Sequence, residues 1–302
     1  MLSARLAFSL DPRRVRSFDG TEIAYHVTGA PHPGAPWVVL ACGLGGSHLP
    51  WRGPIDYLGD RYRFVTWDYR GLYASERPRP ERPGAYALGA HVRDLEAIMS
   101  AEGIERAGVA GWSVGVQVAL EAFRRLPGRV RNLVLLNGVW GRPLGFGLRL
   151  PGAGAAMPGL VELVRRVHAI GASPAHAQDR ARGRRDAFWL KRLGLAGRAL
   201  DEAVLADLAT AAGSLDLDAF LRNLRAFAEH DAGAALATID VPVLVVAGDL
   251  DPLVPPGIAQ QMARRIAEAE LFVVRGGAHM TPLEHPELVS LRIERFYRDH
   301  GF

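Results

Sequence analysis

The sequence predicts an α/β fold in which a doubly wound, mostly parallel sheet carries an inserted helical cap. Short apolar runs, typical of strands buried on both faces, alternate with segments of helical periodicity along most of the chain. This alternation favours a parallel sheet, because each helix returns the chain to the same edge of the sheet. Only helical and loop patterns occupy residues 140–232, and this interruption predicts the cap.

The chain before residue 140 predicts most of the sheet. Residues 14–28 are typical of a β-hairpin that turns at Asp19-Gly20. Buried strands are expected at residues 37–41, 63–67, 107–110 and 130–136. Helices are expected at residues 51–59, at 88–99, and between Gly115 and the helix-stopping pair Pro127-Gly128.

Strand patterns return after residue 232, so that the core falls into two segments around the cap. Strands are expected at 241–247 and 271–274, and helices at 258–266 and 286–297. The predicted parts are therefore residues 1–139 (core), 140–232 (cap) and 233–302 (core). The cap would lie over the carboxyl ends of the strands, where such sheets place their active sites.

The predicted cap begins irregularly and continues with two apolar stripes. Residues 141–159 hold six Gly and three Pro, which argues against one regular element. The stripes recur at helical spacing and are expected to serve packing; they are Leu160, Leu163, Val164, Val167 and Ile170, and then Leu217, Phe220, Leu221, Leu224 and Phe227.

Composition is that of an ordinary globular protein, with 49% hydrophobic and 23% charged residues. No apolar run approaches the roughly 18 residues of a membrane span. The first sixteen residues hold a brief apolar patch that is too short for a secretory signal. We therefore expect a cytoplasmic protein without a membrane span.

The sequence pI is about 9.6, and the basic residues are 35 Arg and one Lys. Such an excess of Arg over Lys is more typical of the amino-acid usage of a genome than of a phosphate-binding surface, and no nucleic-acid motif accompanies it. We expect no nucleic-acid partner. Residues 141–200 carry eleven basic residues against three acids, with a cluster at 180–185. This cluster is either a solvated face or a site for an anionic substrate such as a coenzyme A thioester.

The candidate reactive residue lies where an apolar run meets Gly111-Trp112-Ser113-Val114-Gly115 and a helical pattern follows. This Gly-x-Ser-x-Gly segment, between a strand and a helix, is typical of a nucleophile elbow. Glycine is needed at both flanking positions, since side chains there would clash with the neighbouring strand and helix. Ser113 is therefore predicted to be a nucleophile.

A serine nucleophile needs a base, and the base needs an acid that orients it. Asp249 and Asp251 follow the expected strand 241–247, and His279 follows the expected strand 271–274. The order Ser, Asp, His along the chain is that of the α/β-hydrolase arrangement.

On these motifs the chain resembles the α/β-hydrolase superfamily, in its capped esterase, lipase and haloperoxidase-like branch. The resemblance covers nearly the whole chain and is weakest in the cap. It implies that the acid is the Asp of Gly-x-x-Asp, here Asp251, while Asp249 would be a loop or capping residue. It also selects His279, which opens the segment His-Met-Thr-Pro-Leu-Glu, as the base.

The resemblance also implies two backbone donors for a developing oxyanion, the N–H groups of Leu44 and Val114. The family usually has His-Gly where this chain has Cys42-Gly43. Cys42 is the only cysteine, so it excludes an intrachain disulfide, and we interpret it as a structural thiol. No metal or other cofactor is expected.

Three aromatic residues near these motifs, His48, Trp51 and Trp112, are candidates for substrate binding. For His48 and Trp51, simple packing is an equally good interpretation. The segment Asp68-Tyr69-Arg70-Gly71 resembles a structural Asp-x-Arg-Gly segment of the family. Its charged pair is interpreted as a buried loop clamp.

Together these features predict a serine hydrolase that cleaves a carboxylic ester, lactone or thioester through an acyl-enzyme. A cofactor-free haloperoxidase or perhydrolase, or an acyltransferase, would use the same triad and stays open. A receptor-like protein that binds a ligand with little turnover is the alternative from another class. The expected partner is a small-molecule acyl substrate, and the chain is expected to be a monomer or homodimer.

Overall fold

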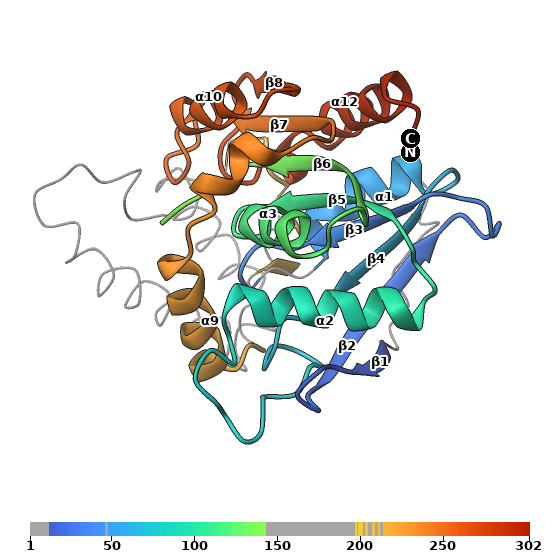
Figure 1. Cartoon of the computed structure of the whole chain (residues 1–302). Coiled ribbons are helices and arrows are strands. Elements are labelled where there is room, and N and C mark those ends of the chain that lie inside the picture. The colour runs from blue at the N-terminus through green and yellow to red at the C-terminus, as the bar shows by residue number, and fades with distance from the viewer. Residues whose placement is uncertain are drawn as a thin grey trace, which may run out of the picture.

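The computed structural model describes residues 12–45, 48–142 and 214–302, together with residues 197, 199–201, 203–204, 207–208 and 211. Its centre is an eight-stranded sheet in the order β1-β2-β4-β3-β5-β6-β7-β8. β1 pairs with β2 and β2 with β4 in antiparallel fashion, and the other neighbours are parallel. The predicted fold class, a mostly parallel doubly wound sheet, is confirmed (Figure 1).

The predicted strands and helices occur where the sequence places them, with ends that differ by a few residues, and the short helices at 233–238 and 281–284 (η3 and α11) were not predicted. The strands are β1 (Arg13–Arg16), β2 (Glu22–Gly29), β3 (Trp37–Ala41), β4 (Arg63–Trp67), β5 (Ala107–Trp112), β6 (Val130–Leu136), β7 (Val243–Gly248) and β8 (Ala269–Val274). The helices are η1 (Leu49–Trp51), α1 (Arg52–Leu58), α2 (Leu88–Ala101), α3 (Gly115–Arg125), α9 (Leu217–Glu229), η3 (Gly233–Thr238), α10 (Pro256–Arg265), α11 (Thr281–Glu284) and α12 (Pro286–Asp299).

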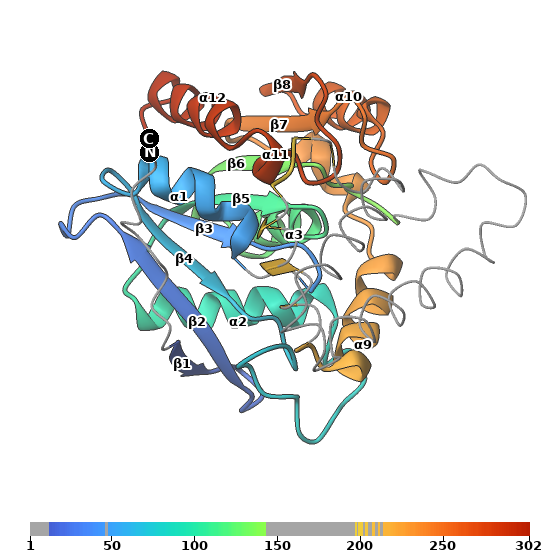
Figure 2. The same ribbon diagram turned by 180° about the vertical axis from the view of Figure 1, so that it is seen from behind.

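The sheet divides the core into two apolar layers, because its central strands are buried on both faces. Helices α2, α3 and α10 contribute to the layer on one face, and α1 and α12 to the layer on the other (Figures 1 and 2). β3, β5 and β7 have only buried residues, which explains their continuous apolar runs in the sequence. Because β3, β5, β6 and β7 run parallel, the carboxyl ends of these strands lie at one edge of the sheet.

Helix α9 lies within the predicted cap and packs on the core through its apolar stripe. Phe220 and Phe227 are buried, and Leu221 and Leu224 pack partly against the same cluster. The helix begins at Asp216, whose carboxylate accepts hydrogen bonds from two backbone N–H groups of the first turn. The packing interpretation of this second stripe is therefore confirmed. The first stripe, the Gly- and Pro-rich segment 143–159 and the arginine cluster lie outside the described residues.

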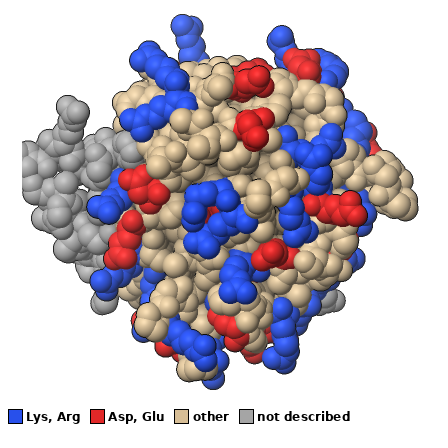
Figure 3. Space-filling view, in the orientation of Figure 1, with Lys and Arg blue, Asp and Glu red and all other residues tan. Residues whose placement is uncertain are grey.

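Charges of both signs are mixed on the face that carries α2 and α3, as Figure 3 shows. Two arginines form ion pairs with carboxylates at the start of α9. Arg77 bonds to Asp216 at 2.7 Å, and Arg222 bonds to Asp218 at 3.0 Å. Within the described residues, no helix is long and apolar enough to cross a membrane.

Arg70 is the centre of a buried ion cluster, but its partners differ from those predicted. Its guanidinium, which is fully buried, bonds to Asp94 at 2.6 Å and to Asp19 at 2.6 Å. Asp68 instead accepts a hydrogen bond from the backbone N–H of Ala74 at 3.1 Å. The segment is a clamp, as predicted, but the pair Asp68–Arg70 does not form, because the Arg70 side chain points to α2 and the β1–β2 turn.

The pKa values of the two carboxyls differ because their burial differs. Burial raises the pKa of Asp94 to about 6, although the hydrogen bonds from Arg70 act in the opposite direction. Asp19 is less buried, and its hydrogen bonds with Arg70 and Thr21 outweigh burial and lower its pKa to about 2. An ionised Asp94 therefore depends on the Arg70 guanidinium.

We expect Arg70→Met to lower the free energy of unfolding by about 3–5 kcal/mol at pH 8, because it leaves Asp94 buried without its partner. The loss should decrease toward pH 5, since a protonated Asp94 carries no charge that needs a partner. Urea denaturation at both pH values measures this. Arg106→Ala, at an exposed arginine, is the control and should change stability by no more than about 0.5 kcal/mol. Equal effects of the two variants would contradict the clamp.

Candidate active site

Ser113 occupies the sharp turn between β5 and α3 in a left-handed backbone conformation, with φ of 57°. A Cβ atom on Gly111 would overlap the carbonyl group of Gly115, and one on Gly115 would overlap the carbonyl oxygen of Ala41. Both positions therefore require glycine. The turn leaves Ser113 partly exposed at the carboxyl end of the sheet.

The structure brings Ser113, His279 and Asp251 into one chain of hydrogen bonds. Ser113 Oγ lies 3.0 Å from His279 Nε2, and His279 Nδ1 lies 2.9 Å from Asp251 Oδ2. The side chains of His279 and Asp251 are 7% and 0% exposed, so water competes little for these bonds. This arrangement can move a proton from the serine hydroxyl to the imidazole.

Asp251 is held as a carboxylate by several donors. Its Oδ1 accepts hydrogen bonds from the backbone N–H groups of Leu253 and Val254, both at 2.9 Å. Its Oδ2 accepts from Asn137 Nδ2 at 3.0 Å as well as from His279. Burial alone would raise the pKa of Asp251, but the charge of His279 and these hydrogen bonds lower it below its usual value.

Asp249, the other candidate acid, has a different position. It is exposed, and its Oδ1 accepts a hydrogen bond from the backbone N–H of Gly276 at 2.7 Å. This bond joins the loops that follow β7 and β8. Asp249 therefore stabilises a loop, and the structure places only Asp251 against His279.

The loop after β3 approaches Ser113 closely. A Cβ on Gly43 would lie 3.3 Å from Ser113 Cβ and 2.6 Å from the Trp112 ring. Within the described residues, the backbone N–H groups of Leu44 and Val114 donate to no protein acceptor. These two N–H groups belong to the residue after Ser113 and to the loop beside it.

Cys42 is a buried thiol. Its Sγ lies 3.3 Å from Thr66 Oγ1, and its carbonyl oxygen accepts a hydrogen bond from the Tyr69 hydroxyl at 2.7 Å. Burial raises the pKa of the Cys42 thiol to about 12. Such a thiol is a poor nucleophile at neutral pH.

The three aromatic candidates for substrate binding lie in different surroundings. Trp51 is fully buried in the apolar layer beneath α1, so substrate contact does not fit its position. Trp112 is also buried, and its indole N–H donates to the carbonyl oxygen of His279 at 3.1 Å. His48 is partly buried, 6.0 Å from the His26 ring between ring centroids, and burial lowers its pKa.

Three buried polar residues that sequence reasoning missed contact Asp251 or the loop that carries His279. Asn137 contacts Asp251, as described above. Thr281 Oγ1 donates to the carbonyl oxygen of Ala278 at 2.6 Å, and Glu284 Oε2 accepts from the Ala278 N–H at 2.6 Å. For Asn137, the signal available in the sequence was the polar pair Asn137-Gly138 at the end of an apolar run. For Thr281 and Glu284, the signal was the segment that follows His279.

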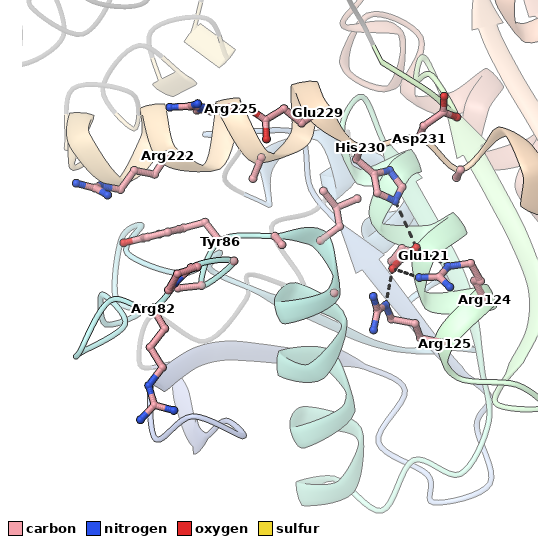
Figure 4. Close-up of a pocket in the computed structure, with 18 of the residues that line it drawn as sticks. Arg82, Tyr86, Glu121, Arg124, Arg125, Arg222, Arg225, Glu229, His230 and Asp231 are labelled. Atoms are coloured by element: carbon pink, nitrogen blue, oxygen red, sulfur yellow. Dashed lines mark hydrogen bonds and ion pairs between the residues drawn. The ribbon is translucent and has the colours of Figure 1, made fainter.

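A separate groove of about 1020 Å³ is lined by α3, α9 and the loop before α2, and Ser113 is not among its lining residues (Figure 4). In it, the buried Glu121 bonds to Arg124 at 2.6 Å, to Arg125, and to His230 at 3.3 Å. The hydrogen bonds from these partners outweigh burial and lower the pKa of Glu121. The cluster ties the end of α9 to α3. Among the described residues, no group of acidic, His or Cys side chains is arranged to hold a metal ion.

A serine on a strand-turn-helix corner, in a mostly parallel sheet with these neighbours, is the arrangement of an α/β-hydrolase. The chain belongs to the alpha/beta hydrolase fold family, whose sequence model matches residues 36–286. The resemblance inferred from the motifs is thus confirmed.

Individual relatives cover nearly all of the chain. The "Putative carbamate hydrolase RutD" of Caulobacter segnis is 30% identical over 274 residues, which are 91% of this chain and 96% of that protein. The enol-lactonase of Burkholderia xenovorans superposes with a TM-score of 0.72 at 22% identity, covering 95% of this chain and 100% of that one. An esterase of Exiguobacterium antarcticum superposes with a TM-score of 0.73 at 19% identity, covering 95% and 99%. At these identities the solved structures show the shared fold.

We expect iodoacetamide to leave Cys42 unmodified in the folded protein at pH 8, because the thiol is buried and protonated. After unfolding in guanidinium chloride the same residue should be alkylated. Mass spectrometry of the intact chain, which has one cysteine, distinguishes the two states. Rapid alkylation of the folded protein would contradict the structural assignment.

Proposed function

We propose that the protein is a serine hydrolase that cleaves a carboxylic ester, lactone or thioester, with Ser113 as nucleophile, His279 as base and Asp251 as orienting acid. The observation that carries the proposal is the continuous hydrogen-bond chain from Ser113 Oγ through the imidazole to Asp251 Oδ2. Each bond lies within the range needed for proton transfer or orientation.

In the acylation step, Ser113 Oγ attacks the substrate carbonyl carbon while its proton passes to His279 Nε2. The Nδ1–H of the resulting imidazolium remains bonded to Asp251, whose ionised carboxylate stabilises the positive charge. His279 then gives the proton to the leaving alcohol or thiol as the carbon–oxygen or carbon–sulfur bond breaks. In a lactone the leaving alcohol stays attached to the acyl group.

In the deacylation step, His279 takes a proton from water, and the hydroxide attacks the acyl-enzyme. The proton returns to Ser113 as the acid is released, so the enzyme is restored. In both steps the carbonyl oxygen gains negative charge, and the N–H groups of Leu44 and Val114 are proposed to donate to it. Their lack of protein acceptors among the described residues supports this role.

A carbamate is a second candidate substrate, because curated relatives at 30% identity carry the name "Putative carbamate hydrolase RutD". The same residues would attack a carbamate carbonyl through the same tetrahedral intermediate. Nitrogen donates electron density to that carbonyl, so carbamates should react more slowly unless the site recognises them. Comparing kcat/KM for matched acetate, thioacetate, lactone and carbamate substrates therefore identifies the preferred bond.

We expect a fluorophosphonate probe to label Ser113, because a base-activated serine attacks phosphorus as it attacks a carbonyl carbon. Ser113→Ala should abolish both labelling and ester turnover, and peptide mapping should locate the adduct. Labelling elsewhere, or none with the folded parent protein, would count against the hydrolase. A protein that binds a ligand without turnover would then be the better hypothesis.

Asp251→Asn should lower kcat by about 10⁴-fold, because an amide no longer holds the imidazole in the required tautomer. Asp249→Asn is the matched control: the same chemical change, made at a carboxylate that bonds to the Gly276 N–H and not to His279, should leave kcat within about threefold. Steady-state kinetics on an activated ester measure both. The reverse order of severity would show that the wrong carboxylate has been assigned.

A further inference from the structure

The order of the strands places the loop that carries His279 far from the strand that precedes Ser113. Ser113, Asn137, Asp251 and His279 follow β5, β6, β7 and β8, which are neighbours in that order. At about 4.8 Å per strand, the ends of β5 and β8 lie roughly 14 Å apart. The loop that carries His279 therefore has to extend across β7 and β6 to reach the serine.

Asn137 lies under this crossing. Its side-chain amide donates to Asp251 Oδ2 at 3.0 Å, to the carbonyl oxygen of Ala278 at 3.1 Å and to Thr281 Oγ1 at 3.2 Å. Ala278 directly precedes His279, so one amide contacts the proposed acid and the backbone next to the proposed base. Trp112 and Glu284 also bond to this loop, but within the described residues neither side chain bonds to Asp251.

The backbone and the charges around Asn137 both favour asparagine there. Its φ is 46°, a left-handed conformation that asparagine tolerates better than most residues. Its side chain is nearly fully buried, and its backbone N–H donates to the carbonyl oxygen of Val246 at 2.9 Å. Because Asp251 and the Ala278 carbonyl can only accept, they fix the amide with its NH₂ group toward them.

We propose that Asn137 is a positioning residue that holds the Asp251 carboxylate and the His279 loop at the distances needed for proton transfer from Ser113. This role rests on the proposed hydrolase function. Asn137 is buried, so it acts through its contacts with Asp251 and the His279 loop. Its amide shares Asp251 Oδ2 with His279 Nδ1 and so fixes the direction from which the imidazole is held.

Two substitutions separate the amide from the backbone conformation. Asn137→Gly keeps the left-handed φ accessible and removes the amide. Asn137→Asp keeps the shape but replaces the donor with a carboxylate beside Asp251. Asn132, buried near the start of β6, the strand that Asn137 follows, provides the matched control Asn132→Asp. All measurements use p-nitrophenyl ester turnover, with kcat expressed per serine that a fluorophosphonate can label.

Asn137→Gly should lower kcat by about 10- to 100-fold with KM within about twofold, because a displaced base slows the chemical step and leaves substrate binding intact. Asn137→Asp should be similarly slow near pH 8. As the pH falls toward about 5.5, the two neighbouring carboxyls come to share a proton, and a protonated Asp at 137 can donate again. The ratio of kcat for Asn137→Asp to that for Asn137→Gly should therefore rise as the pH falls.

Asn132→Asp should lower the melting temperature and leave kcat per labelled serine unchanged. Parent-like kcat in both Asn137 variants would overturn the positioning role, and so would a ratio that does not vary with pH. If Asn137→Gly does not fold, the ratio of Asn137→Asp to the parent carries the same test. A parent protein that neither labels at Ser113 nor hydrolyses the ester shows instead that the hydrolase function is wrong, and the positioning role falls with it.

Discussion

Backbone crowding at the turn between β5 and α3 is the constraint on which the site depends. The turn is so tight that Gly111 and Gly115 leave no space for a Cβ atom, and Ser113 adopts a positive φ. Strain of this kind persists only where the surroundings hold it in place. Here β3 and α3 contact the turn from two sides. The buried core therefore fixes the position of Ser113, which is itself partly exposed to solvent.

Polar contacts hold His279 and Asp251 in place, as crowding of the backbone holds Ser113. Asp251 receives two backbone N–H groups, an amide and an imidazole, while the His279 loop is bonded to Trp112, Asn137 and Glu284. Networks of buried hydrogen bonds permit few alternative arrangements of the groups that they join. The distances of 3.0 and 2.9 Å between the three proposed catalytic residues are thus set by contacts outside the triad.

The order of elements was predictable because burial on both faces produces continuous apolar runs, as in β3 and β7. The tight turn at Ser113 was predictable from a different local pattern, since it demands glycines at fixed positions. The choice between Asp249 and Asp251 needed the family resemblance, because both follow the same strand. Arg70 and Trp51 show the limit: their partners lie in α2, the β1–β2 turn and the layer beneath α1, and no local pattern encodes such contacts.

The contacts of Asn137 could not be predicted from the sequence, for a more general reason. It is distant in the chain from both groups that it contacts, and it becomes central only because β6 lies between β5 and β7 in the sheet. A parallel sheet places the ends of its strands side by side, so residues from four separate segments meet at one edge. The proposed base comes from the outermost of these strands and the proposed nucleophile from the innermost. The strands between them therefore have to supply both the proposed orienting acid and the support for the crossing loop.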